Sequence, residues 1–330
     1  PLVQRIQALD PSFKEADFPR VDPRQRSSAI SGEAVHSRFA GEITTALAGG
    51  GTSVLADSIA ETVGHPESEH VEYAKHLRQS VPESLYAAAH SVEFAYLLVI
   101  ALILDRDGTA VQRQLSLAKD QLGADRARLL QRYYDELAAT GAEYRLPLLA
   151  IAFPALKLRP TQELSYLVSL TTRMIEIDGE IDFYEYCFYR ILMSNLGQAI
   201  DPSGRRSAIR ASRKELQSAV INLLRILADY GHDSEASSDA AFQAGRATLG
   251  RWAQAYDYQA EHDYTVAVLD RSLDFLLGLN NKGKESLLRA ISATAAHDDR
   301  LAVGEAELIR AVCATLDYPL PPILVHRTIS

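Results

Sequence analysis

Apolar residues recur every three to four positions along most of this 330-residue chain. Within the segment 206–230, a single stripe comprises Leu216, Val220, Leu223, Leu224 and Leu227. This spacing places all five side chains on one face of an α-helix. Long segments between the prolines contain neither Pro nor Gly, as helix interiors require. No segment indicates a strand, so the sequence predicts an all-α, multi-helix array.

The predicted helices follow one another from Pro66 onward. A helix opens at Pro66 with acids in its first turn, and another opens at Pro82 and carries an apolar run ending at Leu104. That run of ten residues is too short to span a bilayer, so we interpret it as a core helix. A tight turn at Gly108 leads into the third helix. Further helices are expected at 124–140, 145–158, 161–177, 182–197, 206–230, 236–256, 262–279, 282–296 and 302–317.

The first 65 residues have a different character. Residues 1–9 predict a short amphipathic helix, and residues 10–38 are rich in Pro, Ser, Asp and Arg without any period. Glycines 49–51 predict a flexible joint, since no Gly-Lys-Ser/Thr follows them to make a phosphate loop. We therefore expect an N-terminal helix, an extended arm and a Gly-rich joint before the helical body.

Charge and cysteine content narrow the classes of function. The formal net charge is −9 and the sequence pI about 5.5, which argues against nucleic-acid binding and gives no reason for attraction to anionic lipid. We interpret a local basic patch as a solvated first turn of a helix; it comprises Arg205, Arg206, Arg210, Arg213 and Lys214. The two cysteines have no CxxC spacing, which excludes a disulfide framework and fits a reducing compartment.

An internal repeat appears when the chain is compared with itself at an offset of 120 residues. The matches include leucines and, more tellingly, polar residues: Asp178 with Asp298, Glu185 with Glu305, and Arg190 with Arg310. Ile181 and Leu301 match in kind. The shared pattern is Asp-x-x-(Ile/Leu)-x-x-x-Glu-x-x-x-x-Arg. It divides the chain into 1–65, a helical region at 66–140, repeat 1 at 141–200, connecting helices at 201–260, and repeat 2 at 261–330.

Each copy of the pattern predicts a helix–turn–helix corner. Gly179 stops one helix, because glycine tolerates the left-handed conformation of a C-terminal cap. We expect Ile181 to be buried and to fill the corner, and we expect the same of Leu301 in the second copy. Asp182 and Glu185 have the spacing of a capping box for the next helix. The second copy has Asp299 where Gly179 stands and Ala302 where Asp182 stands, so its turn is expected to be less regular.

The chain shows no catalytic constellation, and no His-Glu-x-x-His motif occurs. We therefore predict neither a catalytic residue nor a zinc site in this chain. An acidic cluster at the first corner comprises Asp178, Glu180, Asp182 and Glu185. Alternating acids could bind a divalent cation, although an EF-hand places its bidentate Glu at position 12. Caps and solvated carboxylates are the alternative interpretation.

The helix after the first corner is rich in aromatic residues. Tyr184, Tyr186 and Tyr189 lie beside Phe183 and Phe188. Core packing is the ordinary interpretation of such a helix. Tyrosines on its outer face would instead form a protein-binding patch.

The two corners, IDGEIDFYE and HDDRLAVGE, resemble the Asp-Gly-x-Ile-x-x-x-Glu signature of TerB-like helical domains, found in tellurite-resistance and co-chaperone proteins. The opening PLVQRIQALDPSF resembles the segment after the peptidase domain of HtpX-like membrane zinc metallopeptidases. Three further segments resemble the long C-terminal extension of one branch of that family: VGHPESEHVEYAKHL, VPESLYAAAHSVEFAYLLVIALILDRD and LIRAVCATLDYPLPPIL. The resemblance covers nearly the whole chain.

The resemblance implies a cytoplasmic accessory region of a membrane-bound protease, on the inner face of the plasma membrane. Such a region would bind substrates, chaperones or a second copy of itself, with no nucleic acid and no membrane contact of its own. The family's zinc ligands have no counterpart here, so zinc is expected only in a peptidase domain preceding Pro1. The alternative is a free-standing TerB-like stress-response module that binds divalent metal at its acidic corner.

Overall fold

The computed structural model describes residues 75, 77–106, 108–179, 181–202, 211–232, 234–254, 266–298, 301 and 303–318. Within them, all regular structure is helical apart from Leu301, which forms an isolated β-bridge. The predicted all-α class is therefore confirmed. The N-terminal helix, arm and glycine joint expected within 1–65, the first turns of the helix expected from Pro66, and most of the basic patch lie outside the described residues; Lys75 and residues 77–80 are helical, as expected.

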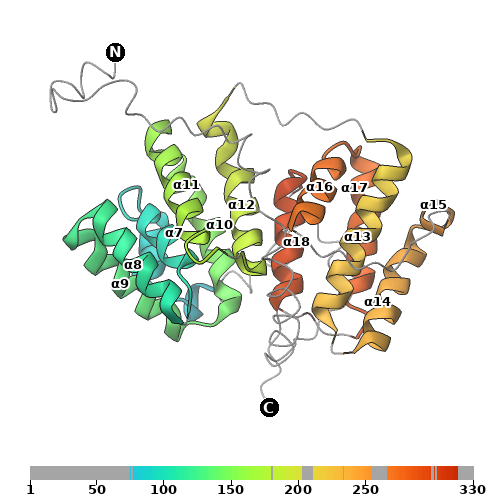
Figure 1. Cartoon of the computed structure of the whole chain (residues 1–330), viewed down its shortest axis with the longest axis horizontal. Coiled ribbons are helices and arrows are strands. Elements are labelled where there is room, and N and C mark those ends of the chain that lie inside the picture. Colours follow the sequence, from blue (N-terminus) through green and yellow to red (C-terminus); the bar gives the residue numbers. More distant parts are fainter. Residues whose placement is uncertain are drawn as a thin grey trace. The chain divides into compact units, whose positions relative to one another are not determined.

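The helices follow in the order expected from the sequence (Figure 1). Their bounds are α6 (Glu83–His90), α7 (Ala95–Ile103), α8 (Gly108–Leu122), α9 (Ala124–Ala139), the short 3-10 helix η2 (Ala142–Tyr144), α10 (Arg145–Leu156), α11 (Thr161–Ile175), α12 (Phe183–Ile200), α13 (Arg213–Gly231), α14 (Glu235–Thr248), α15 (Arg251–Gln254), α16 (Val266–Leu276), α17 (Asn281–Ala295) and α18 (Val303–Thr315).

The helix predicted from Pro82 to Leu104 is two helices, which corrects the expectation. The axes of α6 and α7 differ by 119° across the break. Ser91 is extended there, and its Oγ accepts a hydrogen bond from the Phe94 backbone N–H at 3.3 Å. Serine side chains offer the backbone such an alternative to helical bonding. The break turns α7 into the interior.

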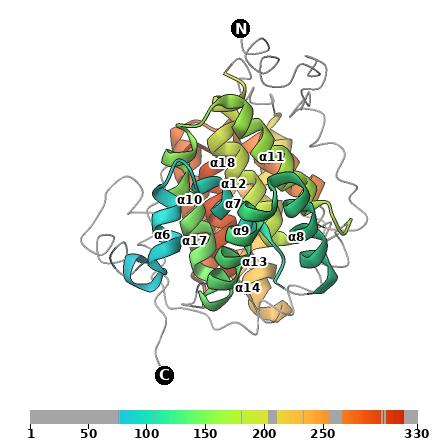
Figure 2. The same cartoon turned by 90° about the vertical axis from the view of Figure 1, so that its left-hand side faces the viewer.

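Nearly all of α7 is buried, which confirms its interpretation as a core helix. From Leu97 to Leu104 every side chain is at most 2% exposed. Helices α6, α9, α10 and α11 pack around it, and Figure 2 shows α6, α7 and α10 side by side. No single described helix is long and apolar enough to cross a membrane; α6 and α7 meet that test only as a bent pair.

Two further helices have bounds that differ from those expected from the apolar periodicity. The helix expected at 206–230 is helical only from Arg213 in the described chain, because Ser212 caps it in a capping box with Glu215. The helix expected at 236–256 breaks into α14 and α15 at Gly250. This glycine has φ +56°, a left-handed conformation that ends a helix.

The 120-residue offset is reproduced by the helix bounds. Helix α11 spans 161–175 and α17 spans 281–295, while α12 and α18 begin at 183 and 303. Helices α10 and α16 end at 156 and 276. The sequence repeat therefore corresponds to two sets of three helices with matching boundaries.

The packing extends this repeat to two helical groups, which we call the first group (α7–α12) and the second group (α13–α18). In the first group α7 packs on α10 and α11, and in the second α13 packs on α16 and α17. The groups meet along α12 and α18, the central pair in Figure 1. Because each of these helices follows a corner, both corners lie at the junction of the groups.

Candidate functional site

The first corner has the geometry that its sequence predicts. Gly179 has φ +84°, the left-handed conformation expected after α11. The capping box is present: the Asp182 carboxylate accepts from the Glu185 N–H at 2.6 Å, and the Glu185 carboxylate accepts from the Asp182 N–H at 2.9 Å. Ile181 is 6% exposed and fills the corner. These bonds fix the direction in which α12 leaves the corner.

The second corner keeps the buried positions of the first. Leu301 and Glu305 are each 1% exposed, and α18 begins at Val303, two residues after Leu301. Asp298 lies on the surface at the end of the preceding turn. Asp299 and Ala302, on which the expectation of a less regular turn depends, lie outside the described residues.

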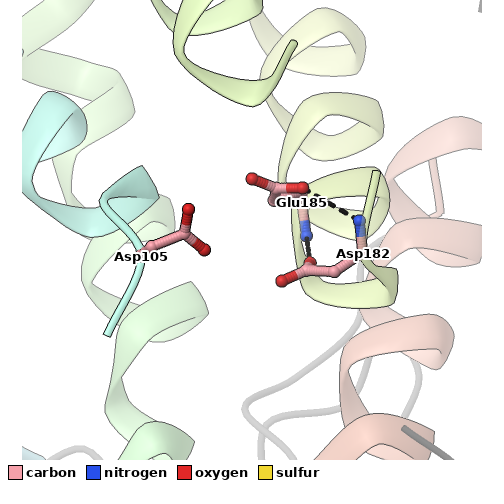
Figure 3. Close-up of side chains that lie close together, drawn as sticks. All are labelled: Asp105, Asp182 and Glu185. Carbon is pink, nitrogen blue, oxygen red and sulfur yellow. Dashed lines mark hydrogen bonds between the residues drawn. The ribbon is translucent and has the colours of Figure 1, made fainter. Parts of the chain in front are cut away.

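The acidic cluster that the structure assembles differs from the one expected. Carboxylate oxygens of Asp105, Asp182 and Glu185 lie within 4.8 Å of one another. Figure 3 shows Asp105, which follows α7, pointing toward the two residues of the capping box. Asp178 is half-buried and does not belong to this set, and Glu180 lies outside the described residues. No local sequence pattern indicates Asp105, because it is far from the corner along the chain.

The electrostatics of this cluster are unfavourable for ionised carboxylates. Glu185 is only 3% exposed, and its burial, together with the negative charge of Asp182, raises its pKa well above 4.5. A divalent cation would relieve this repulsion, as would a proton. The cluster offers oxygen ligands of the type that Ca²⁺ and Mg²⁺ prefer.

Of the three tyrosines considered for an outward binding patch, Tyr186 takes part in core packing instead. Tyr186 is 3% exposed and donates a hydrogen bond from its hydroxyl to Asp270 at 3.0 Å. Tyr184 is half-buried and donates to the backbone oxygen of Leu102 at 2.9 Å. Tyr189 is also half-buried. Core packing, the ordinary interpretation, therefore holds for Tyr186, whereas the outward patch stays a prediction for Tyr184 and Tyr189.

The polar partner of Tyr186 is part of a buried ionic link between the groups. Arg190 on α12 pairs with Asp270 at 3.0 Å and with Asp274 at 3.2 Å, both on α16. Arg190 and Asp270 are 14% and 16% exposed, so this pair is largely shielded from solvent. Together with the Tyr186 hydroxyl it fixes the register of α12 against α16.

A groove that the sequence did not predict lies among α7, α8, α9 and α11. Its volume is about 320 Å³, at the small end of the roughly 300–1,000 Å³ typical of ligand pockets. Its lining combines aliphatic, aromatic, amide and charged side chains: Tyr96, Ile100, Gln121, Leu122, Arg126, Arg159, Gln162, Glu163, Tyr166 and Leu167. No local motif signals it, because four separate helices and the turn at Arg159 contribute these residues.

Three large apolar side chains are exposed in the described chain; one of them lines this groove, and the other two are next to the lining residue Arg159 in sequence or bonded to it. They are Leu158 (74% exposed), Val92 (41%) and Tyr166 (39%). Tyr166 lines the groove, and Leu158 precedes the lining residue Arg159. Arg159 also donates a hydrogen bond to the backbone oxygen of Val92 at 2.5 Å. Exposed apolar side chains beside a polar rim are typical of an interaction surface.

Two guanidinium groups flank the aromatic wall of the groove. The Arg159 and Arg126 guanidinium carbons lie 4.6 Å and 6.0 Å from the centroid of the Tyr96 ring. Burial raises the pKa of the Tyr96 hydroxyl, which these arginines oppose. Arg159 also pairs with Glu163 at 2.6 Å. The groove is thus a partly cationic site on a chain of net charge −9.

No protein-family model matches the chain, and neither does any curated protein or solved structure. Two features of the described residues remain as candidates for function. One is the groove with its exposed apolar neighbours, and the other is the acidic cluster at the first corner.

Proposed function

We propose that this chain is the non-catalytic, protein-binding region of a membrane-bound zinc-dependent endopeptidase. It would act on the cytoplasmic side of the plasma membrane and bind a substrate, a chaperone or a second copy of itself. The observation that carries the protein-binding role is the group of exposed apolar residues beside the groove: Val92, Leu158 and Tyr166. The protease context is supported by the resemblance of several segments, in order, to HtpX-like extensions.

The exposure of Leu158 has a physical cost that a binding role would explain. Removing apolar surface from water contributes about 25 cal/mol per Å², so a leucine left 74% exposed forgoes most of that gain. Its neighbours Ala155 and Leu156 are buried, so the same turn contains fully packed side chains. A protein segment with apolar residues would recover this energy on binding.

Under this proposal, the catalytic site belongs to another domain of the parent protein. The zinc of an HtpX-like enzyme would be held by a His-Glu-x-x-His helix in the preceding peptidase domain. The gene upstream of Pro1 tests this directly: we expect one reading frame with membrane helices and that motif. A reading frame that begins within a few codons of Pro1 would refute the protease context.

Proteolysis by the full-length parent tests the binding role. Leu158→Asp should slow digestion of casein, an unfolded protein, while cleavage of a short fluorogenic peptide stays unchanged. Only the long substrate would need a binding surface outside the active site. Ala240→Asp is the matched control, because Ala240 is exposed on α14 in the second group. Equal casein digestion by both variants would contradict the binding role.

A second candidate function is divalent-cation binding by a free-standing stress-response module. The observation that favours it is the convergence of Asp105, Asp182 and Glu185 within 4.8 Å. Calorimetric titration of the chain with Ca²⁺ and with Zn²⁺ would measure such binding. Stoichiometric binding heat that is lost in Asp105→Asn would support the cation-binding function. The absence of binding heat with both ions would refute it.

A further inference from the structure

The groove of the first group has a closed counterpart in the second group. There α14 packs tightly along α17, because Gly245 allows the backbone of α14 to approach Ala290 and Thr294. In the first group, α8 reaches α11 through long side chains instead. The Tyr166 hydroxyl donates to the Gln121 side-chain oxygen at 3.2 Å, and the Gln114 amide donates to the Met174 backbone oxygen at 3.1 Å. This wider spacing leaves the groove open.

The charges in the groove favour an anionic group. Among the described residues, no carboxylate lies within 4.0 Å of the Arg126 guanidinium, whereas Arg159 is engaged by Glu163 and by the Val92 backbone oxygen. Arg126 thus offers a charge and a planar set of N–H donors to an incoming ligand. A carboxylate fits such a donor set with two parallel hydrogen bonds.

The remaining lining suits a peptide. The accessible apolar part of the wall comprises half-buried Leu122 and the exposed ring of Tyr166, with Ile100 and Leu167, at most 2% exposed, also in the lining. The amide of Gln162 can donate and accept hydrogen bonds with a peptide backbone. A volume of about 320 Å³ accommodates a short chain end better than a helix or a folded loop.

We propose that this groove binds the C-terminal end of a protein partner. The last side chain, an aliphatic one, packs on Leu122 and the Tyr166 ring, and the terminal carboxylate pairs with Arg126. This inference rests on the proposed protein-binding function and specifies its partner chemistry: a free C-terminus with an apolar last residue. Capture of a terminal carboxylate is a recurring mode of peptide recognition.

Fluorescence polarisation with the full chain tests the proposal. The probe is a fluorescein-labelled hexapeptide pool, randomised at its first positions and ending in Leu with a free carboxylate. We expect saturable binding that weakens at least tenfold when the same pool is C-terminally amidated. We also expect at least a tenfold loss in Arg126→Gln, because the carboxylate loses its charged partner.

Arg128→Gln is the matched control. Arg128 lies on the same helix and is also exposed, but it pairs with Asp125 and does not line the groove. Its variant should bind the free-acid pool as tightly as the unmodified chain. Equal affinity for acid and amide, or equal losses in the two arginine variants, would overturn the proposal. A further control is an amidated pool that carries one internal Asp. If this pool binds as tightly as the free acid, any carboxylate suffices, and the proposal of a chain-end site is overturned.

The two proposals fail in different ways. If the groove is not the site, Arg126→Gln leaves peptide binding unchanged, while Leu158→Asp still slows casein digestion by the parent. If the protein-binding role itself is wrong, Leu158→Asp has no effect on casein digestion, whatever the peptide pools do. Thermal unfolding of each variant verifies that neither result comes from a loss of folding.

Discussion

Replacing Gly245 with alanine tests the close contact that closes the second group. A Cβ at this position would lie 2.8 Å from the backbone oxygen of Ala290 and closer still to the Thr294 hydroxyl. Real Cβ atoms essentially never approach heavy atoms more closely than 3.0 Å, so α14 or α17 must shift. Overpacking of this kind costs about 1–3 kcal/mol.

Gly197 on α12 provides the matched substitution. It also lies within a helix, but a Cβ there would meet nothing within 4 Å. Alanine should therefore stabilise this position by about 0.5–1 kcal/mol, through reduced chain entropy and higher helix propensity. Both variants gain this intrinsic term, so their difference in unfolding free energy reports the packing cost at Gly245.

Urea unfolding followed by far-ultraviolet circular dichroism measures both free energies. We expect Gly197→Ala to be the more stable variant by about 1–3 kcal/mol. Equal stabilisation of both variants would refute the reasoning. It would mean that α14 and α17 are not held at contact distance, and the contrast between a closed second group and an open first group would fail with it.

Three further predictions concern buried residues. Ile181→Ala and Leu301→Ala should each lower the free energy of unfolding by about 2–5 kcal/mol. Val92 is 41% exposed, so Val92→Ala should change it by less than about 0.5 kcal/mol. Equal urea midpoints for all three variants would contradict the corner packing. The raised pKa of Glu185 means that the folded chain holds its proton more tightly than the unfolded chain, so stability should fall as pH rises from 4.5 through the raised pKa. Glu185→Gln keeps an acceptor for the Asp182 N–H but has no carboxyl group to titrate. Its free energy of unfolding, relative to that of the unmodified chain, should therefore increase across that pH window. A decrease of this difference in urea unfolding would contradict the raised pKa of Glu185. Cys187 and Cys313 are 0% and 1% exposed, and burial raises the pKa of Cys313 to about 12, so neither thiol should react with Ellman's reagent until the chain unfolds; rapid reaction in native buffer would count against their burial.

Much of the helical architecture could be predicted from the sequence, because it depends on contacts between residues close in the chain. The 3.6-residue period places the helices, and the Asp182–Glu185 capping box joins residues only three apart. The left-handed Gly179 follows from its missing Cβ. The offset of 120 residues survives as matching helix bounds because each copy repeats the same local signals.

Only the tertiary structure decided which of these helices meet and what their surfaces form. Tyr184 and Leu102 are 82 positions apart, yet they share a hydrogen bond, and no periodic pattern predicts that contact. Asp105 joins the acidic cluster, and Tyr186 turns inward to Asp270, for the same reason. The groove depends on the spacing between α8 and α11, which packing sets through side chains from both helices. Local propensity fixes where a helix begins and ends, whereas the distance between two helices depends on residues that the chain brings together only on folding.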